Sequence, residues 1–256
     1  INKMKFTLKA LGLAVIASAS SLSFAEAPAL PYDLSFSGSA AVTTDYRFRG
    51  ITQTLSDPAV QAGFTLGHAS GLYFGLWGSN VDFGEGSPHL ELDPSLGYAT
   101  TLDGFLFKPL LDVGVIYYNY PIESDFNWLE LYGKLSFKEV LTQGDAILTN
   151  INYTNDYAGV DLDSWNVNAS YSLPLAASGF GAILGVGYTT IDEDDFFNGD
   201  DNYIDWKAGL TYNFKSLPSV TAELAAVGTN IDTDGLSRSI ERGYETGAVF
   251  TLTNTF

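Results

Sequence analysis

The chain has 256 residues, 46% of them hydrophobic and 14% aromatic, with 30 acidic residues, 12 basic residues and no cysteine. The lack of cysteine excludes a disulfide framework, an iron–sulfur cluster and a thiolate zinc site. The excess of acid excludes nucleic acid as a partner, because phosphate binding needs clustered Lys and Arg.

The first 25 residues have the pattern of a secretory signal peptide. Lys5 and Lys9 form a basic start, residues 10–16 are apolar, and Ser23 and Ala25 supply the small residues of a cleavage site. The apolar run is too short for a membrane-spanning helix, which needs about 20 residues. We therefore expect residues 1–25 (a few upstream residues plus the leader) to be removed. Residues 26–256 then form one domain of net charge −21, since all 30 acids and nine of the 12 basic residues lie in it.

Alternation of apolar and polar residues predicts about twelve strands in this domain. A period of two gives each strand one apolar and one polar face, and about ten residues cross a bilayer as a tilted strand. We expect strands at residues 34–49, 59–67, 72–81, 89–100, 105–120, 127–138, 145–154, 164–173, 182–190, 203–215, 220–228 and 244–256.

The connections between these strands fall into two classes. With both termini of the chain on the periplasmic side, connections after odd strands should be longer than those after even strands. The long acidic segments all follow odd strands, and residues 192–201 alone hold six acids. This sorting favours a fixed topology across a membrane. Bridging of residues 192–201 to lipopolysaccharide by divalent cations is one hypothesis for the acids.

Aromatic residues on the apolar faces gather at both strand ends, with aliphatic residues between them. One set lies near the long connections: Tyr46, Phe48, Tyr117, Tyr153, Trp165, Tyr188, Trp206 and Tyr244. The other lies at the opposite ends: Phe36, Tyr98, Phe107, Phe137, Tyr171, Tyr212, Phe214 and Phe256. Two aromatic belts around an aliphatic band are typical of a membrane barrel. The sequence thus predicts an all-β fold, a transmembrane antiparallel up-and-down β-barrel in the outer membrane of a Gram-negative bacterium.

The last expected strand ends on Phe256 and should pair with the first strand, which removes both free edges. A terminal strand of this kind looks like the signal that the barrel-assembly machinery reads. The expected partners are therefore this machinery, outer-membrane lipid and lipopolysaccharide, and small solutes.

The polar faces of the strands define the expected lumen. By parity, its charged residues are Asp45, Arg47, Arg49, Glu91, Asp93, Lys108, Asp112, Glu130, Lys134, Asp205, Lys207, Glu223 and Glu245. Eight strands are filled by side chains and sixteen leave an open channel, so twelve are compatible with a restrictive pore or a plugged interior. We expect a channel for small hydrophilic solutes whose acidic mouth favours cations or neutral solutes. A non-conducting structural or adhesive barrel with acidic loops is the alternative.

No motif in the sequence indicates catalysis, a cofactor or a resident metal ion. The two histidines, His68 and His89, lie at strand ends without a serine motif around them, so no catalytic residue is expected. Residues 194–205 resemble a calcium loop, but Phe196 stands where an oxygen ligand is required. We expect no cofactor and no resident metal.

The segment TTDYRFRGITQ at residues 43–53 resembles the opening motif of the TorF family of porins. The resemblance extends over residues 26–256 in length, acidity and the C-terminal strand, while later segments match in style only. It implies an outer-membrane barrel of pore function and does not imply a substrate.

Overall fold

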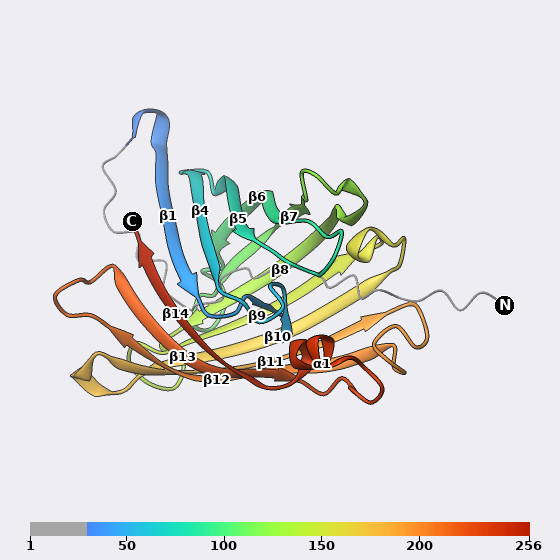
Figure 1. The fold of residues 1–256 in the computed structure, drawn as a ribbon. Coiled ribbons are helices and arrows are strands. Elements are labelled where there is room, and N and C mark those ends of the chain that lie inside the picture. Colours follow the sequence, from blue (N-terminus) through green and yellow to red (C-terminus); the bar gives the residue numbers. More distant parts are fainter. Residues whose placement is uncertain (1–29) are drawn as a thin grey trace.

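The computed structural model describes residues 30–256, so the expected signal peptide lies outside the described residues. These residues form a closed antiparallel barrel of twelve strands (Figure 1). The barrel strands are β1 (Leu34–Thr43), β4 (Ala59–His68), β5 (Leu72–Asn80), β6 (Leu90–Thr101), β7 (Leu110–Tyr118), β8 (Trp128–Lys138), β9 (Ala146–Thr154), β10 (Ser164–Pro174), β11 (Phe180–Ile191), β12 (Asn202–Asn213), β13 (Val220–Thr229) and β14 (Gly247–Thr255).

Short elements accompany the barrel. They are the paired strands β2 (Arg47–Phe48) and β3 (Ile51–Thr52), the helix α1 (Arg238–Tyr244), and the 3-10 turns Pro31–Asp33, Ser124–Phe126, Tyr157–Gly159 and Ala176–Ser178. Within residues 30–256, no helix is long and apolar enough to cross a membrane.

The barrel closes where the first strand meets the last, as predicted. β1 pairs with β4 along its whole length and with β14 over Ser39–Thr43, where Val42 lies opposite Leu252. Beyond that ladder, the Gly38 N–H donates to the Phe256 carbonyl at 2.8 Å, and the Phe256 N–H donates to the Gly38 carbonyl at 3.0 Å. Closure leaves no long free edge for pairing with another chain.

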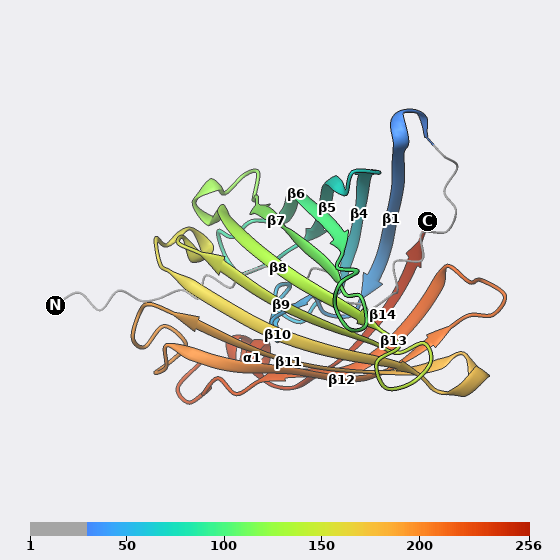
Figure 2. The same ribbon diagram turned by 180° about the vertical axis from the view of Figure 1, so that it is seen from behind.

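The two ends of the barrel differ in their connections (Figures 1 and 2). We call the end at which β1 begins and β14 ends the inner end. It carries the short connections 69–71, 102–109, 139–145, 175–179 and 214–219. At the outer end lie 44–58, 81–89, 119–127, 155–163, 192–201 and 230–246. The long acidic segments thus share one end, as the sequence predicted.

The outward face is apolar and exposed, in the manner of a lipid-facing wall. Aliphatic side chains such as Leu131 and Val186 are about half exposed, at 49% and 54%. Trp165 and Tyr188 are exposed near the outer end, and Tyr98 near the inner end. A soluble barrel would bury such residues, whereas a bilayer solvates them.

Three predicted strands were too long. The first stops at Thr43, and the strand expected to begin at residue 105 begins at Leu110. Phe107 and Lys108 have φ of 61° and 41°, in the left-handed region, which turns the chain before the strand. At the C-terminal side, Tyr244 closes α1, and β14 begins only at Gly247.

Candidate functional site

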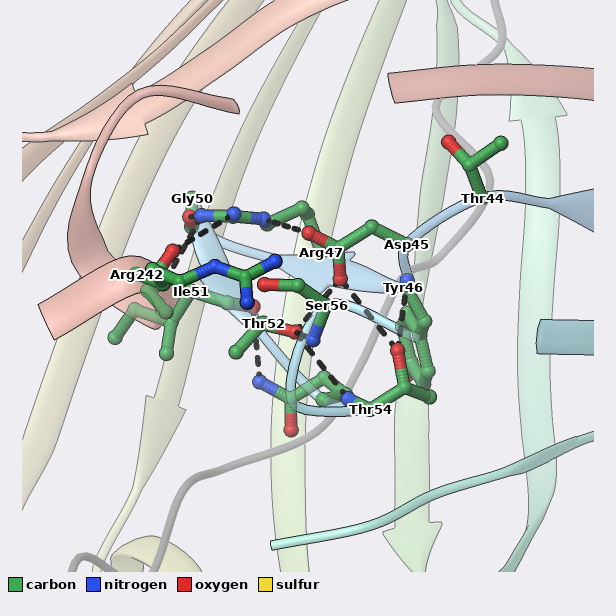
Figure 3. A network of polar contacts seen from close by, with 12 residues as sticks. Thr44, Asp45, Tyr46, Arg47, Gly50, Ile51, Thr52, Thr54, Ser56 and Arg242 are labelled. Carbon is green, nitrogen blue, oxygen red and sulfur yellow. Dashed lines mark hydrogen bonds and ion pairs between the residues drawn. The ribbon is translucent and has the colours of Figure 1, made fainter. Parts of the chain in front are cut away.

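The connection between β1 and β4 folds into the barrel lumen. We call residues 44–58 the plug hairpin; it contains β2 and β3, joined by a turn in which Arg49 and Gly50 have φ of 46° and 82°. The Gln53 N–H donates to the Tyr46 carbonyl at 2.6 Å and tightens the hairpin. Figure 3 shows its polar contacts, and Tyr46 and Gln53 are almost completely buried.

Asp45 and Arg47 organise the hairpin and fasten it to α1. The Arg47 Nε donates to Asp45 Oδ2 at 2.5 Å, and the Thr52 hydroxyl donates to Asp45 Oδ1 at 2.6 Å. The other guanidinium nitrogens donate to the carbonyls of Arg242 and Gly243, at 3.1 and 2.9 Å. A cation at the C-terminal end of a helix is favourable, because the last carbonyls lack partners there.

Arg49 fastens the hairpin to the opposite wall. Its Nη2 donates to Glu130 Oε2 on β8 at 2.6 Å, and the two side chains are only 8% and 3% exposed. The Tyr118 hydroxyl donates to the other Glu130 oxygen at 3.1 Å. Burial alone would lower the pKa of Arg49, but the Glu130 carboxylate raises it overall, so the guanidinium stays charged.

A third contact joins the hairpin to β6. The hydroxyls of Tyr46 and Tyr120 donate to the two carboxyl oxygens of Glu91, at 3.0 and 2.9 Å. Asp93 lies two residues along the same face and accepts the Asn119 N–H at 3.3 Å, while its Oδ2 is buried without a hydrogen-bond partner. No basic side chain among the described residues pairs with either carboxyl group.

Aromatic packing fills the rest of the outer half of the lumen. Tyr118 stacks on Trp128 with ring centroids 4.0 Å apart, and Tyr157 meets Trp128 edge-on at 5.5 Å. Burial raises the pKa of Tyr157 to about 12, so its hydroxyl stays neutral. The buried cluster also contains Tyr46, Phe48, Ile51, Tyr120, Tyr132, Phe197, Tyr203, Ile231 and Tyr244.

Burial of the inward-facing positions changes along the barrel. In the outer half they are buried: Thr43, Gln61, Ser79, Glu91, Glu130, Asn152, Asn166, Thr189 and Val227. In the inner half most are partly exposed (Ser37, Thr65, Ser136, Leu148, Ser172, Lys207, Thr211, Glu223 and Thr253), while Gly181 and Ile183 on β11 are buried. The inner half is therefore a mainly polar, partly exposed vestibule, closed at its outer limit by the plug hairpin and the aromatic cluster.

The thirteen predicted lumen charges separate into groups. Asp45, Arg47 and Arg49 lie in the hairpin, while Glu91, Asp93 and Glu130 line the wall that it packs against. Asp112, Lys134, Lys207 and Glu223 face the vestibule, where Lys207 pairs with Glu223 at 2.5 Å.

The other three predicted residues belong to neither of these groups. Asp205 faces the lumen at the level of the plug, and its Oδ2 is buried without a partner. Glu245 follows α1 and accepts a hydrogen bond from Arg238 at 3.2 Å. Lys108 lies in the exposed turn 102–109, 3.4 Å from Asp103, and is not on the lumen face because β7 begins after it.

Three aromatics assigned to the outer lipid belt lie inside the barrel. Tyr46, Phe48 and Tyr244 are buried at 1%, 5% and 6% exposure, because the segments that carry them turn inward. The buried Trp128, Tyr157 and Tyr203 were not foreseen either. Periodicity carried no signal of this inward turn, because residues 46–49 alternate aromatic and charged side chains as a lipid-facing strand end would.

The histidines lie outside the lumen site. His68 Nδ1 contacts the Ser70 hydroxyl at 2.8 Å in an exposed turn, and His89 precedes β6 and is exposed. Among the described residues, no group of three or more His, Asp or Glu side chains has an arrangement that could hold a metal ion.

A closed twelve-stranded barrel with an apolar outer band and a polar lumen has the architecture of outer-membrane porins. The chain belongs to the family Gcw_chp, described as "Bacterial protein of unknown function", which matches residues 25–256. Among solved structures it is similar to the NanC porin, with 12% identity and a TM-score of 0.51 over 87% of this chain and 99% of that one. It is also similar to the KdgM porin, with 7% identity and a TM-score of 0.51 over 86% of this chain and 98% of that one. At these identities the likeness shows the fold alone. No curated protein matches the sequence.

Proposed function

We propose that this protein is an outer-membrane channel for small hydrophilic solutes, and that the plug hairpin holds it closed. One observation carries the proposal: a polar, partly exposed vestibule ends at a loop that folds inward. Thr43 at the end of β1 lies opposite Ala59 at the start of β4, so the wall is complete without the hairpin. If the lumen were simply filled with side chains, its inner half would have no need to be partly exposed.

The contacts that hold the hairpin suit a closure that can be released. Such contacts can be exchanged for water, since the net contribution of a neutral hydrogen bond is only about 1 kcal/mol and that of one to a charged group about 1.5–3 kcal/mol. The resemblance of residues 43–53 to the TorF family of porins adds support, because those residues make up most of the plug.

The charge balance supports passage of cations or neutral solutes. The two arginines of the hairpin are paired with Asp45 and Glu130, so neither leaves an unpaired positive charge in the lumen. The acidic residues of the outer connections therefore determine the electrostatic field at the outer end of the barrel. Contacts with lipid and lipopolysaccharide, and recognition of the strand ending at Phe256 by the barrel-assembly machinery, belong to the same proposal.

A non-conducting structural or adhesive barrel is the second candidate. The observation in its favour is the aromatic cluster, which packs the outer half of the lumen like a protein core. Such a barrel would keep the plug closed permanently and use its acidic outer connections to bind surface partners.

Planar-bilayer recording separates the two candidates. We expect purified, folded wild-type protein to give discrete conductance steps when the plug hairpin is released, and a variant with residues 45–57 replaced by a short Gly-Ser turn to give larger steps. Folding is checked by heat-dependent gel mobility. If the wild type shows no conductance above the lipid baseline while the shortened variant conducts, the barrel is a permanently closed one and the channel proposal fails.

A further inference from the structure

Four polar side chains form a row across the vestibule wall at the edge of the plug. Asp112 on β7 lies directly opposite Lys134 on β8, Lys134 opposite Asn150 on β9, and Asn150 opposite Asn168 on β10. All four are partly exposed. The next lumen-facing residues toward the outer end, Tyr132, Asn152 and Asn166, are buried. The row therefore lies at the level where the vestibule ends. We call it the polar row.

The two charges of the row do not pair with each other. No ion pair joins Lys134 to any carboxylate of the described residues. Its Nζ lies 4.1 Å from the ring centre of Tyr132, while Asp112 Oδ1 accepts the Tyr73 hydroxyl at 2.6 Å. The ammonium group has three donors, and none meets an acceptor in the described part of the chain.

Glycines make this separation possible. The ring of Tyr73 lies against Gly97 and that of Tyr132 against Gly114, where any larger residue would collide with the tyrosines. The two hydroxyls contact each other above β6 and β7. Tyr73 thereby reaches across the wall to Asp112 and competes for the carboxylate that Lys134 would otherwise bind.

An unused acceptor on Asn150 lies on the strand next to Lys134, and a second, on Ser170, lies one strand further along. The Asn150 Oδ1 and the Ser170 Oγ are buried and have no hydrogen-bond partner. A buried polar atom without a partner is destabilising, so these positions favour a ligand that supplies the missing bonds. The row offers an ammonium donor and, on either side of it, a carboxylate and a carboxamide oxygen.

We propose that the polar row binds a compact zwitterion of the α-amino acid type. Its carboxylate accepts from Lys134, and its ammonium group donates to Asp112 on the neighbouring strand. Side chains directly opposite on neighbouring strands are about 5 Å apart, so one small molecule reaches both charges. A net-neutral solute also avoids repulsion by the acidic barrel, unlike a free anion. The inference deepens the proposed channel function and rests on it, because the solute enters through the vestibule.

Calorimetric titration of the folded full-length protein in detergent tests the site. L-alanine is the zwitterionic probe, propionate lacks its ammonium group, and ethylamine lacks its carboxylate. We expect saturable heat with L-alanine only. Loss of one charged contact corresponds to about 1.4 kcal/mol or more, so Lys134→Met and Asp112→Asn should each weaken binding at least about tenfold. Lys134→Arg should retain binding.

Lys108→Met is the matched control, since it removes a lysine from the exposed turn outside the barrel and should leave binding unchanged. Equal affinity for propionate, or unchanged affinity in both Lys134→Met and Asp112→Asn, overturns the proposal.

Conductance measurements separate the proposed binding site from the proposed channel function. A conducting wild type that binds no L-alanine disproves this site alone, and a silent wild type that binds it disproves the channel alone.

Discussion

At the scale of single residues, Arg49 is the side chain whose loss should weaken the plug most. Its partner Glu130 would remain buried without a counter-charge, and breaking a buried pair in this way costs about 3–5 kcal/mol. We expect Arg49→Met to lower the free energy of unfolding by about 3 kcal/mol. The measurement is urea-induced unfolding in lipid vesicles, followed by tryptophan fluorescence.

Two further variants make the Arg49 result specific. Glu130→Gln added to Arg49→Met should recover part of the loss, because the unpaired charge is then removed. Arg238→Met is the control: that arginine also makes ion pairs, but its side chain is 67% exposed, so its loss should cost less than about 1 kcal/mol. Equal costs for Arg49→Met and Arg238→Met would show that the buried pair does not hold the plug.

At the scale of elements, the barrel strands were predictable and the plug hairpin was not. A strand facing lipid on one side shows strict alternation, as Leu129 and Leu131 do against Glu130. Residues 44–49 continue that alternation in sequence, so periodicity alone extends the first strand to Arg49. The inward turn depends on partners far away in the chain, such as Glu91, Glu130 and the carbonyls at the end of α1.

The same limit explains the outcome for the candidate site. Parity placed Asp112, Lys134, Lys207 and Glu223 on the lumen face, because a strand's two faces follow from its sequence. Which charges would pair, and that Lys134 would not, depended on cross-strand register and on Tyr73 lying over Gly97. Neither is readable from one strand at a time.

The hairpin can be locked to α1 by an engineered disulfide. A Cβ at Gly243 lies 3.9 Å from the Thr52 Cβ, close to the mean spacing of about 3.8 Å in disulfides, and the native chain has no cysteine to compete. We expect oxidised Thr52→Cys/Gly243→Cys protein to stay at the lipid baseline in bilayer recordings. Reduction should restore wild-type conductance, and each single-cysteine variant should respond to neither treatment. A locked barrel that conducts like the wild type would show that solutes pass without movement of the plug.

At the scale of the whole molecule, the excess of acid should set ion selectivity. Because the hairpin arginines are neutralised locally, the acids of the outer connections act on any ion at the mouth. Their field is screened beyond about 10 Å at 0.1 M salt and beyond about 3 Å at 1 M. Reversal potentials under a salt gradient should therefore show cation preference that weakens as both salt concentrations rise. Replacing Asp192, Glu193, Asp194 and Asp195 by their amides should reduce the preference at low salt and leave it nearly unchanged at high salt. Anion selectivity in the wild type, or a preference independent of salt, would mean that the vestibule charges determine selectivity instead of the mouth.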